Sequence, residues 1–288
     1  MKGEVELSII TPVFNGVRFL EFAINNFIQQ NCPAAEHIII DGGSTDGSLE
    51  VIKRYANKYS HLRWLSEKDS GQSDAMNKGI RMARGRIVSF LNADDFYEPN
   101  VFNRALRIFQ GLPEPSFVAG NCNIWADENC LTGVCRPTHL KLEDLLMGYS
   151  FHPHPVNPTS YFYHKSLHEK AGMYREDLHL AMDQEFIFRA VQHADCLYVN
   201  EIWGNYRCLK GTKTRDDIDS GEIIVRDRRF LCESRKQLSL GGKINLYAKI
   251  FKEVLIKGFL FNGRPIIKSI LGQKRVMEIK RFFKKRLR

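Results

Sequence analysis

The stretch that decides the fold class is RIVSFLNADD, residues Arg86–Asp95. Its first part, Arg86–Leu91, is apolar enough to form a buried strand, and the acidic pair Asp94 and Asp95 follows almost at once. Near-continuous apolar strands are typical of parallel sheets that are covered by helices on both faces. Ligands of such sheets bind outside the carboxyl ends of the strands, so the acidic pair lies where a binding site is expected.

The residues before this stretch alternate between strand and helix periodicity. Apolar runs of strand length end in polar or glycine-rich segments, and apolar stripes at helical spacing follow them. The expected strands are 6–13, 37–43, 62–66 and 86–92, and the expected helices are 16–30, one capped by 44–46, and 73–83. This order predicts an α/β fold with a Rossmann-like, mostly parallel sheet flanked by helices.

The second half of the chain is less regular. The expected strands are 116–125, 130–136 and 196–202, the expected helices are 141–148 and 181–193, and 150–166 is an extended, proline-containing run. From Asp216 onward the pattern is helical and increasingly charged. We therefore expect residues 1–115 and 116–215 to form two halves of one domain, and residues 216–288 to form a helical, basic C-terminal extension.

Polar side chains follow each of the first four expected strands. They are Thr11 and Asn15, Asp41, Glu67 and Asp69, and Asp94 and Asp95. Because the carboxyl ends of parallel strands meet at one edge of a sheet, we expect these side chains to line a single rim. Turn chemistry explains any one of them, but four strands that end in this way predict a binding site.

The net charge of +9 is concentrated at the end of the chain. Residues 241–288 hold 14 Lys and Arg against two Glu, a net charge of +12, whereas residues 1–240 carry 28 basic and 31 acidic side chains. Nucleic-acid enzymes more often carry basic residues across the site face. The charge distribution therefore argues against nucleic acid as a partner.

Cysteine spacing and hydropathy indicate a cytoplasmic protein. None of the seven cysteines has CxxC spacing, so neither a disulfide framework nor a zinc site is expected. The N-terminal segment lacks the features of a signal peptide, and no run reaches the roughly 18 apolar residues of a membrane-spanning helix. We expect a cytoplasmic protein that is at most peripheral on the inner face of the cytoplasmic membrane.

The pair Asp94 and Asp95 has two interpretations. Asp is a common turn and N-cap residue, and Asp95 would then cap the following segment. Alternatively, the pair is a site for Mg²⁺ or Mn²⁺, which take one or two carboxylates and leave other positions to substrate phosphates. The sequence has neither a GxxxxGK[ST] phosphate loop nor a GxGxxG after the first strand. This combination favours a metal-bridged diphosphate of the kind that nucleotide-sugar enzymes bind.

Four motifs carry a resemblance to a known family. They are TPVFNG (11–16), IIIDGGSTDGS (38–48), SGQSDAMNKGI (70–80) and FLNADD (90–95), in this order. The ordered set resembles the family 2 glycosyltransferases of the GT-A fold, and among them the bacterial O-antigen and capsule polysaccharide transferases. The resemblance is strong over residues 5–100 and continues more weakly to about residue 215.

The resemblance implies a donor site for a nucleotide-diphosphate sugar, with UDP as the favoured nucleotide. The residues that it assigns to the base and ribose are Thr11, Pro12, Phe14, Asn15, Asp41 and Asp69. Asp94 and Asp95 would form a DXD-type element that binds Mn²⁺ or Mg²⁺ and the diphosphate. The metal would neutralise charge that develops on the leaving nucleoside diphosphate.

The sequence departs from the family pattern at two places. The family often has Asp where this chain has Asn92, so a ribose contact there is expected to be weaker or differently made. Many members have Arg where this chain has Met76 and Asn77. Diphosphate contact would then fall to Lys78 or to Arg207.

Inverting members of the family deprotonate the acceptor hydroxyl with a carboxylate at the start of a helix in the second half. LAMDQEFIFRA (180–190) matches this pattern, and the resemblance assigns Asp183 as the base with Glu185 in reserve. A first-turn carboxylate is also favoured by the helix dipole alone, so the alternative is a charge without a catalytic role. Arg207, in NYRCLKGTKT (205–214), resembles the segment that closes over the donor.

The basic extension has two apolar helical faces. One consists of Ile244, Tyr247, Ile250, Phe251, Val254 and Leu255, and the other of Val276, Ile279, Phe283 and Leu287. One interpretation is a solvated helical tail that packs on the domain. The other is binding to an anionic membrane surface, where apolar faces insert shallowly and each basic residue adds about 1 kcal/mol.

Together these patterns predict a metal-dependent inverting glycosyltransferase in cell-surface polysaccharide synthesis. The donor would be a UDP-sugar and the acceptor a hydroxyl of a glycan or of a polyprenyl-diphosphate-linked sugar. A sugar-phosphate nucleotidyltransferase is the alternative among enzymes, but TPVFNG supplies no Gly-rich, basic phosphate loop. A non-catalytic nucleic-acid-binding protein is the alternative outside enzymes.

Overall fold

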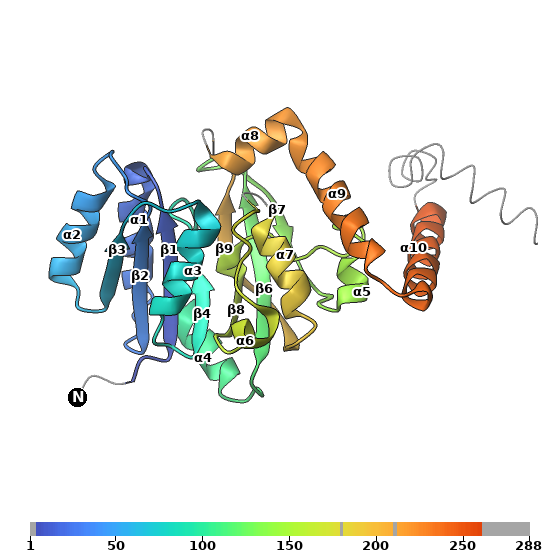
Figure 1. Cartoon of the computed structure of the whole chain (residues 1–288), viewed down its shortest axis with the longest axis horizontal. Coiled ribbons are helices and arrows are strands. Elements are labelled where there is room, and N and C mark those ends of the chain that lie inside the picture. The colour runs from blue at the N-terminus through green and yellow to red at the C-terminus, as the bar shows by residue number, and fades with distance from the viewer. Residues whose placement is uncertain (1–3, 179–180, 210–211, 261–288) are drawn as a thin grey trace, which may run out of the picture. The chain divides into compact units, whose positions relative to one another are not determined.

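The computed structural model describes residues 4–178, 181–209 and 212–260. The chain divides into two compact units, residues 1–230 and 231–288, and the boundary falls within helix α9 (Glu222–Lys236). All of the predicted site residues belong to the first unit. The elements of that unit are shown in Figure 1.

The order of elements in the first unit begins with the predicted strand–helix alternation. The strands are β1 (Leu7–Val13), β2 (Ala35–Asp41), β3 (Leu62–Ser66), β4 (Ile87–Phe90), β5 (Phe96–Tyr97), β6 (Ser116–Trp125), β7 (Leu131–Cys135), β8 (Tyr161–His164) and β9 (Asp195–Arg207). The helices are α1 (Val17–Gln29), α2 (Ser48–Lys58), α3 (Gln72–Met82), α4 (Val101–Phe109), α5 (Leu142–Leu145), the 3₁₀ helix η1 (Pro158–Ser160), α6 (Leu167–Ala171), α7 (Met182–Ala190) and α8 (Lys213–Ser220).

The described strands form one nine-stranded sheet in the order β3-β2-β1-β4-β8-β6-β9-β5, with β7 paired to β6. Strands β1 to β4 are parallel, β8 is antiparallel to β4, and β6 is antiparallel to β8 and parallel to β9. Strands β6 and β9 therefore point the same way as β1 to β4. The carboxyl ends of six strands meet at one edge, and β8 begins there.

Alternate residues of the buried strands face different helices. Ile39 of β2 packs with Ile24 of α1 and Ile52 of α2. Ile10 of β1 faces α3, where a Cβ built on Gly79 would lie 2.3 Å from Cγ2 of Ile10. Only a residue without a side chain allows α3 to lie this close to β1. This close packing fixes the start of α3, with its SGQSD sequence, at the rim.

Three differences from the sequence expectations have physical reasons. Strand β9 runs from Asp195 to Arg207 rather than ending at residue 202, because its second part pairs with both β6 and β5. Helix α7 ends at Ala190, because the next residues form turns rather than a further helical turn. Residues 44–46 were expected to cap the second helix, but α2 starts only at Ser48, because Gly47 before it has a φ of 97°. Of these three residues, Asp46 accepts a hydrogen bond from the Ser48 N–H, at 3.0 Å.

The described part of the second unit is dominated by α10 (Leu240–Leu260). Leu246, Ile250 and Val254 are buried on one side of this helix. The exposed large apolar side chains are Leu240, Ile244, Tyr247 and Phe251. No helix among the described residues combines the length and the apolar character needed to cross a bilayer. The predicted apolar face at residues 276–287 lies outside the described residues.

Candidate active site

The loops after β1 and β2 form one hydrogen-bonded unit at the rim. The backbone N–H groups of Asn15, Gly16 and Val17 donate at 2.8, 3.1 and 2.9 Å to side-chain oxygens of the β2–α2 loop and of the first residue of α2. The acceptors are, in the same order, Ser44 Oγ, Ser48 Oγ and Asp46 Oδ2. The backbone donors at the start of α1 are therefore occupied by protein groups and are not free to cradle a phosphate.

The predicted base-binding segment differs in accessibility along its length. Thr11 is fully buried, and its hydroxyl lies 2.8 Å from Nε2 of His37. Burial lowers the pKa of His37 to about 3, so this imidazole is neutral at physiological pH. Pro12 is half-buried, and Phe14 is 65% exposed at the end of β1. Phe14 and Asn15 are thus the accessible members of this segment.

Asp41 and Asp69 lie next to each other but have different environments. Asp41 is fully buried, and its oxygens accept from the Ser44 N–H at 3.2 and 3.3 Å and from the Ser66 hydroxyl at 2.6 Å. Oδ2 of Asp69 sits so close to Gly42 that a Cβ there would be 2.4 Å from it. Asp69 is half-buried and accepts from the Gly71 N–H at 3.0 Å. Asp41 therefore organises the turn, and Asp69 is the more accessible carboxylate.

Asp95 is the buried member of the acidic pair. It is 1% exposed, and its carboxylate accepts three hydrogen bonds. The donors are Asn157 Nδ2 at 2.7 Å, Asn92 Nδ2 at 3.0 Å and the Arg207 N–H at 2.9 Å. These donors come from three segments of the chain that are far apart in sequence. Asp95 therefore joins the β4–β5 loop to η1 and to the end of β9.

Asp94 is the less buried and less hydrogen-bonded member of the acidic pair. It is half-buried, and no other described residue donates a hydrogen bond to its carboxylate. Burial raises the pKa of Asp94 above its ordinary value, with partial compensation from Arg207. Burial and then repulsion from Asp94 raise the pKa of Asp95. The ionised pair is thus destabilised, and a cation beside Asp94 would relieve that destabilisation.

Arg207 is held against α1 and the acidic loop. Its Nε donates to the backbone carbonyl of Asp94, and its guanidinium carbon lies 4.5 Å from the ring centre of Phe22 and 5.8 Å from those of Phe19 and Phe96. Such cation–π contacts hold a guanidinium in place. Nη2 is buried and has no hydrogen-bond partner among the described residues. Arg207 thus fixes the acidic loop through both its backbone and its side chain.

The other predicted diphosphate contacts have partners of their own. Lys78 Nζ lies 2.9 Å from Glu67 and 3.2 Å from Asp74, and its side chain is 14% exposed. Asn92 accepts from Gln72 Nε2 at 3.3 Å in addition to its bond to Asp95. The structure therefore brings Asn92 to the acidic pair, whereas Lys78 is engaged in ion pairs with Glu67 and Asp74.

The two candidate bases differ in how strongly protein donors engage their carboxylates. The Asp183 carboxylate accepts one hydrogen bond, from the Tyr161 hydroxyl at 3.2 Å, and burial raises the pKa of Asp183 to about 6. Glu185 receives two bonds of 2.7 Å from the guanidinium of Arg189, which also donates to the carbonyl of Met173. Glu185 therefore acts as a structural ion pair, and Asp183 keeps an oxygen available.

Sequence reasoning missed three residues of this site. Asn157 and Tyr161 were counted only as part of an extended run, and Asn77 only as a departure from the family. Asn77 Nδ2 donates to the carbonyl of Tyr174 at 2.9 Å and thereby ties α3 to the segment before α7. A signal existed for Asn157 alone, since Asn before Pro is a turn-initiating pair.

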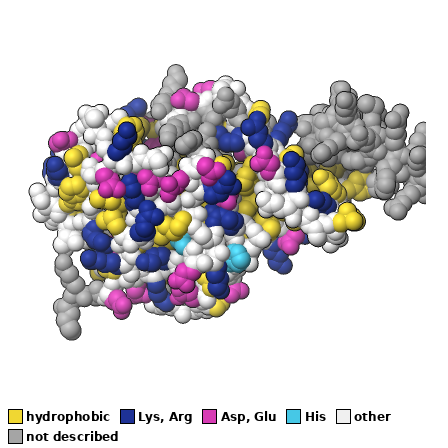
Figure 2. Space-filling view, in the orientation of Figure 1, with side chains coloured by type: hydrophobic (Ala, Val, Ile, Leu, Met, Phe, Trp, Pro, Cys, Tyr) yellow, Lys and Arg dark blue, Asp and Glu magenta, His cyan; other side chains and the backbone are white. Residues whose placement is uncertain are grey.

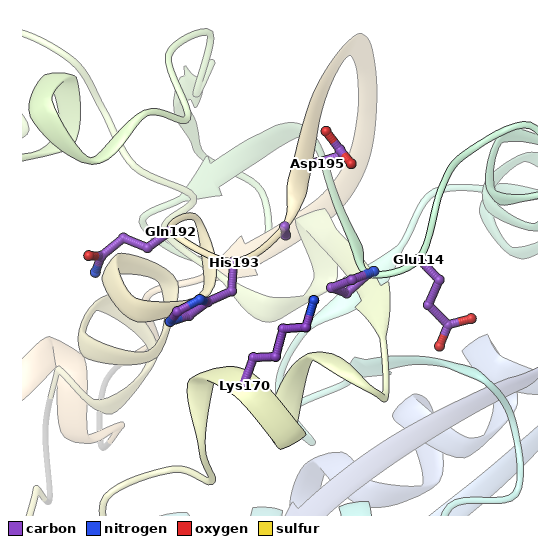
Figure 3. Close-up of a pocket in the computed structure, with 7 residues that line it drawn as sticks. Glu114, Lys170, Gln192, His193 and Asp195 are labelled. Carbon is purple, nitrogen blue, oxygen red and sulfur yellow. The ribbon is translucent and has the colours of Figure 1, made fainter.

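Two cavities of the first unit lie away from this rim. A polar cavity of about 480 Å³ is lined by Glu114, Lys170, His193 and Asp195, at the amino ends of β6 and β9. Figure 3 shows that its labelled side chains fan out instead of converging on one point. No group of three or more His, Cys, Asp or Glu that could hold a metal occurs within residues 4–178, 181–209 and 212–260. A cation at the rim would therefore depend on Asp94 together with ligand oxygens.

Comparison with known proteins gives matches to glycosyltransferases. The family model for glycosyl transferase family 2 matches residues 8–130. The uncharacterized glycosyltransferase Rv1514c of Mycobacterium tuberculosis (strain ATCC 25618 / H37Rv) is 34% identical over 66% of this chain and 70% of its own length. The uncharacterized glycosyltransferase YibD of Escherichia coli (strain K12) is 39% identical over 38% of this chain. The match spans only 31% of the length of YibD.

A further relative and two solved structures agree. The putative teichuronic acid biosynthesis glycosyltransferase TuaG of Bacillus subtilis (strain 168) is 33% identical over 35% of this chain and 40% of its own length. S. aureus TarS 1–349 in complex with UDP-GlcNAc aligns with a TM-score of 0.66 at 18% identity, over 93% of this chain and 80% of TarS. The Pyrobaculum calidifontis mannosyltransferase PcManGT, in complex with GDP-Man and Mn²⁺, aligns at 0.61 and 17% identity, over 96% and 81%. At these identities the structures indicate a shared fold.

Proposed function

The chain belongs to glycosyltransferase family 2, and we propose that it transfers a sugar from a nucleotide-diphosphate sugar, with UDP favoured, to a hydroxyl of a glycan or polyprenyl-diphosphate-linked acceptor. The predicted α/β, GT-A-type fold is confirmed by the likeness to TarS and PcManGT. The kinship to TuaG supports a role in polysaccharide synthesis.

One observation carries the assignment of roles. Among the described carboxylates of the rim, Asp41, Asp95 and Glu185 have their oxygens occupied by protein donors. Asp94 accepts nothing from another described residue, whereas Asp183 and Asp69 each accept a single bond. Asp94 and Asp183, whose pKa values are raised, suit one binding role and one base role, and Asp69 is left for the donor.

Asp94 fits a divalent cation better than Asp95 does. Mg²⁺ and Mn²⁺ prefer sites with one or two carboxylates and with phosphate or water oxygens in the other positions. Asp94 provides such an oxygen, whereas both oxygens of the Asp95 carboxylate already accept from N–H donors, three in all. When bound, the cation would neutralise the charge of the leaving nucleoside diphosphate. Asp95 would hold the loop that presents Asp94.

We assign the contacts with the donor according to how accessible each side chain is. Phe14 offers an exposed ring for stacking on the base, and base–aromatic stacking contributes about 1–3 kcal/mol. Asp69, next to Gly42, is the accessible acceptor, and Asp41 supports the turn after β2 through its bonds to Ser44 and Ser66. Thr11, Asn15 and Asn92 would shape the donor site through their hydrogen bonds to His37, Thr45 and Asp95, and the half-buried Pro12 follows Thr11 in β1.

On the acceptor side, Asp183 would take the proton of the attacking hydroxyl. A single base that activates a direct attack, opposite the leaving diphosphate, inverts the configuration of the sugar carbon. Glu185 is already neutralised by Arg189 and is not available as a second carboxylate. These contacts support an inverting reaction with Asp183 as the base.

The test uses donor binding and transfer separately. UDP, GDP, CDP and dTDP, each with and without Mn²⁺, are compared by thermal shift on the wild type and on Asp94→Ala. A ligand at 100 times its Kd stabilises by about 2.7 kcal/mol. We expect a shift for one nucleotide that requires Mn²⁺ and Asp94, and expect Asp183→Asn to keep that shift while losing transfer. Retention of more than about a tenth of transfer by Asp183→Asn would remove it as the base.

Peripheral membrane association is the second part of the proposal. The apolar side chains of Leu240, Ile244, Tyr247 and Phe251 are exposed along α10, and the surrounding segment is strongly basic. Such a face inserts shallowly into an anionic surface. Ile244→Asp should weaken binding to phosphatidylserine vesicles more than Asn245→Asp, which makes the same charge change beside this face. If both variants bind equally weakly, electrostatic attraction alone explains the binding and the apolar face does not insert. If the wild type does not bind these vesicles, this part of the proposal is wrong.

The alternative functions are less favoured by the site. A nucleotidyltransferase needs free backbone donors after β1, whereas those of Asn15, Gly16 and Val17 are occupied. For a nucleic-acid-binding protein, a one-sign basic surface is expected. Figure 2 instead shows Lys and Arg interspersed with Asp and Glu over the visible face of the first unit.

A further inference from the structure

Tyr161 is the only described side chain that hydrogen-bonds the Asp183 carboxylate. Its hydroxyl donates to Oδ1 at 3.2 Å, and the residue is fully buried. Tyr161 opens β8, which is antiparallel to β4, and its backbone carbonyl accepts from the Ser89 hydroxyl at 2.7 Å. The hydroxyl therefore belongs to the rigid sheet, directly beside the strand that leads to the acidic pair.

The helix that carries Asp183 is pressed onto the same sheet by aromatic contacts. Phe186 of α7 stacks on Tyr174 with ring centres 4.5 Å apart and lies 5.1 Å from the ring of Tyr163. The ring of Tyr174 in turn meets Phe90 of β4 edge-on at 5.5 Å. These contacts fix the position of α7, but the orientation of the Asp183 carboxylate is left to its hydrogen bond.

Among the described residues, the groups that face Asp183 are neutral. Tyr161 and Tyr163 approach from β8 and Tyr174 from the segment before α7. The Tyr163 hydroxyl is 3.0 Å from Nε2 of His168, and Nδ1 of that ring is 3.0 Å from the Gly172 carbonyl. Nδ1 must therefore carry the proton, and the Tyr163 hydroxyl donates to Nε2 rather than to Asp183.

We propose that Tyr161 is a positioning residue for Asp183, orienting one carboxylate oxygen and keeping the other directed to the acceptor hydroxyl. This inference rests on the proposed role of Asp183 as the base. Burial, and then the Asp183 charge, raise the pKa of Tyr161 well above its ordinary value, so its hydroxyl stays protonated and remains a donor. A hydrogen bond to the charged form of a carboxyl group lowers its pKa and opposes the effect of burial.

The bonding changes place Tyr161 outside the proton transfer itself. The acceptor oxygen forms a bond to the sugar carbon as the bond from that carbon to the diphosphate oxygen breaks. The acceptor O–H proton passes to the free oxygen of Asp183, and the nucleoside diphosphate leaves with the electron pair. Tyr161 keeps its own proton throughout and acts through the carboxylate.

Tyr161→Phe is the test, with Tyr163→Phe as the matched control from the same strand. Transfer is measured from pH 5 to 9. We expect Tyr161→Phe to move the acid limb of kcat/KM up by about one pH unit, the size expected for losing a hydrogen bond to a charged group. At pH 6 kcat should fall about fivefold while the donor KM stays within about twofold, because Tyr161 hydrogen-bonds the proposed base and none of the residues proposed for the donor. Tyr163→Phe should leave the limb in place.

Two outcomes would overturn the inference: an unmoved limb in Tyr161→Phe, or an equal shift in both variants. If Tyr161→Phe does not fold, 3-fluorotyrosine at position 161 replaces it, since the more acidic hydroxyl is a stronger donor and should move the limb down. A limb that stays or moves up would refute the proposal. Failure of the proposed function is recognised separately, by an active Asp183→Asn.

Discussion

Removing Asp95 should destabilise the protein far more than removing Asp94, although the two residues are adjacent. Asp95→Ala leaves three donors without their acceptor, namely the Arg207 N–H and the amides of Asn92 and Asn157, at a position that is only 1% exposed. A stranded buried donor costs about 1–3 kcal/mol. Relief of burying a carboxylate with a raised pKa offsets part of the loss. We therefore expect a net loss of about 3 kcal/mol.

Asp94→Ala leaves no described donor without its acceptor, and it removes the electrostatic repulsion between the two carboxylates. Its free energy of unfolding should change by less than about 1 kcal/mol. In thermal denaturation without metal, 1 kcal/mol corresponds to about 2–4 °C in a protein near this size. Tm should therefore fall by roughly 6–12 °C in Asp95→Ala and by no more than about 4 °C in Asp94→Ala. Equal losses would refute the division into a loop-holding and a ligand-binding carboxylate.

The remaining predictions concern single residues of the site. The pKa of Asp183 is raised to about 6 and the base must be ionised, so kcat/KM should fall about tenfold per pH unit below that value; a profile that is flat to pH 5 contradicts this. For stability the sign is opposite, because a carboxyl with a raised folded pKa stabilises most below its ordinary value of 3.8. Wild type should thus lose stability relative to Asp183→Asn as pH rises from 4 to 7 in urea denaturation. Glu185→Gln weakens the pair with Arg189 and should cost about 2 kcal/mol in the same assay, with transfer by the folded enzyme nearly unchanged. Phe14→Ala should raise the Kd for the nucleotide about tenfold in calorimetry and leave Tm within about 2 °C, since the ring is exposed; a large loss of Tm would show that the ring packs in the core.

The sequence predicted the frame of the site well, for a physical reason. Strand-length apolar runs that end in Asp41 and Asp94 report burial and chain direction together, and both were confirmed in β2 and β4. The antiparallel placement of β8 could not be read in this way, because its short apolar run has no period that distinguishes the two directions.

The different roles of the carboxylates could not be predicted from the sequence. Asp94 and Asp95 are chemically identical, and only contacts with Asn157 and Arg207 make one of them structural. These partners come from segments that β8 and β9 bring together, so no local sequence pattern predicts their contacts with Asp95. Lys78 is a similar case, because its ion pair with Glu67 depends on how α3 lies beside the segment that follows β3.

The bond from the Arg207 N–H to Asp95 also bears on how the protein is made. The two residues are 112 positions apart, so the acidic loop is completed only by a late segment of the domain. During synthesis the first parallel strands leave the ribosome long before β9 exists, and contacts of such long range form late. A nascent chain that stops before β9 would have a sheet edge with a loose acidic loop. The site should therefore form in one step once β9 has emerged, and grafting residues 1–115 onto a foreign second half should fail unless that half supplies the missing donors.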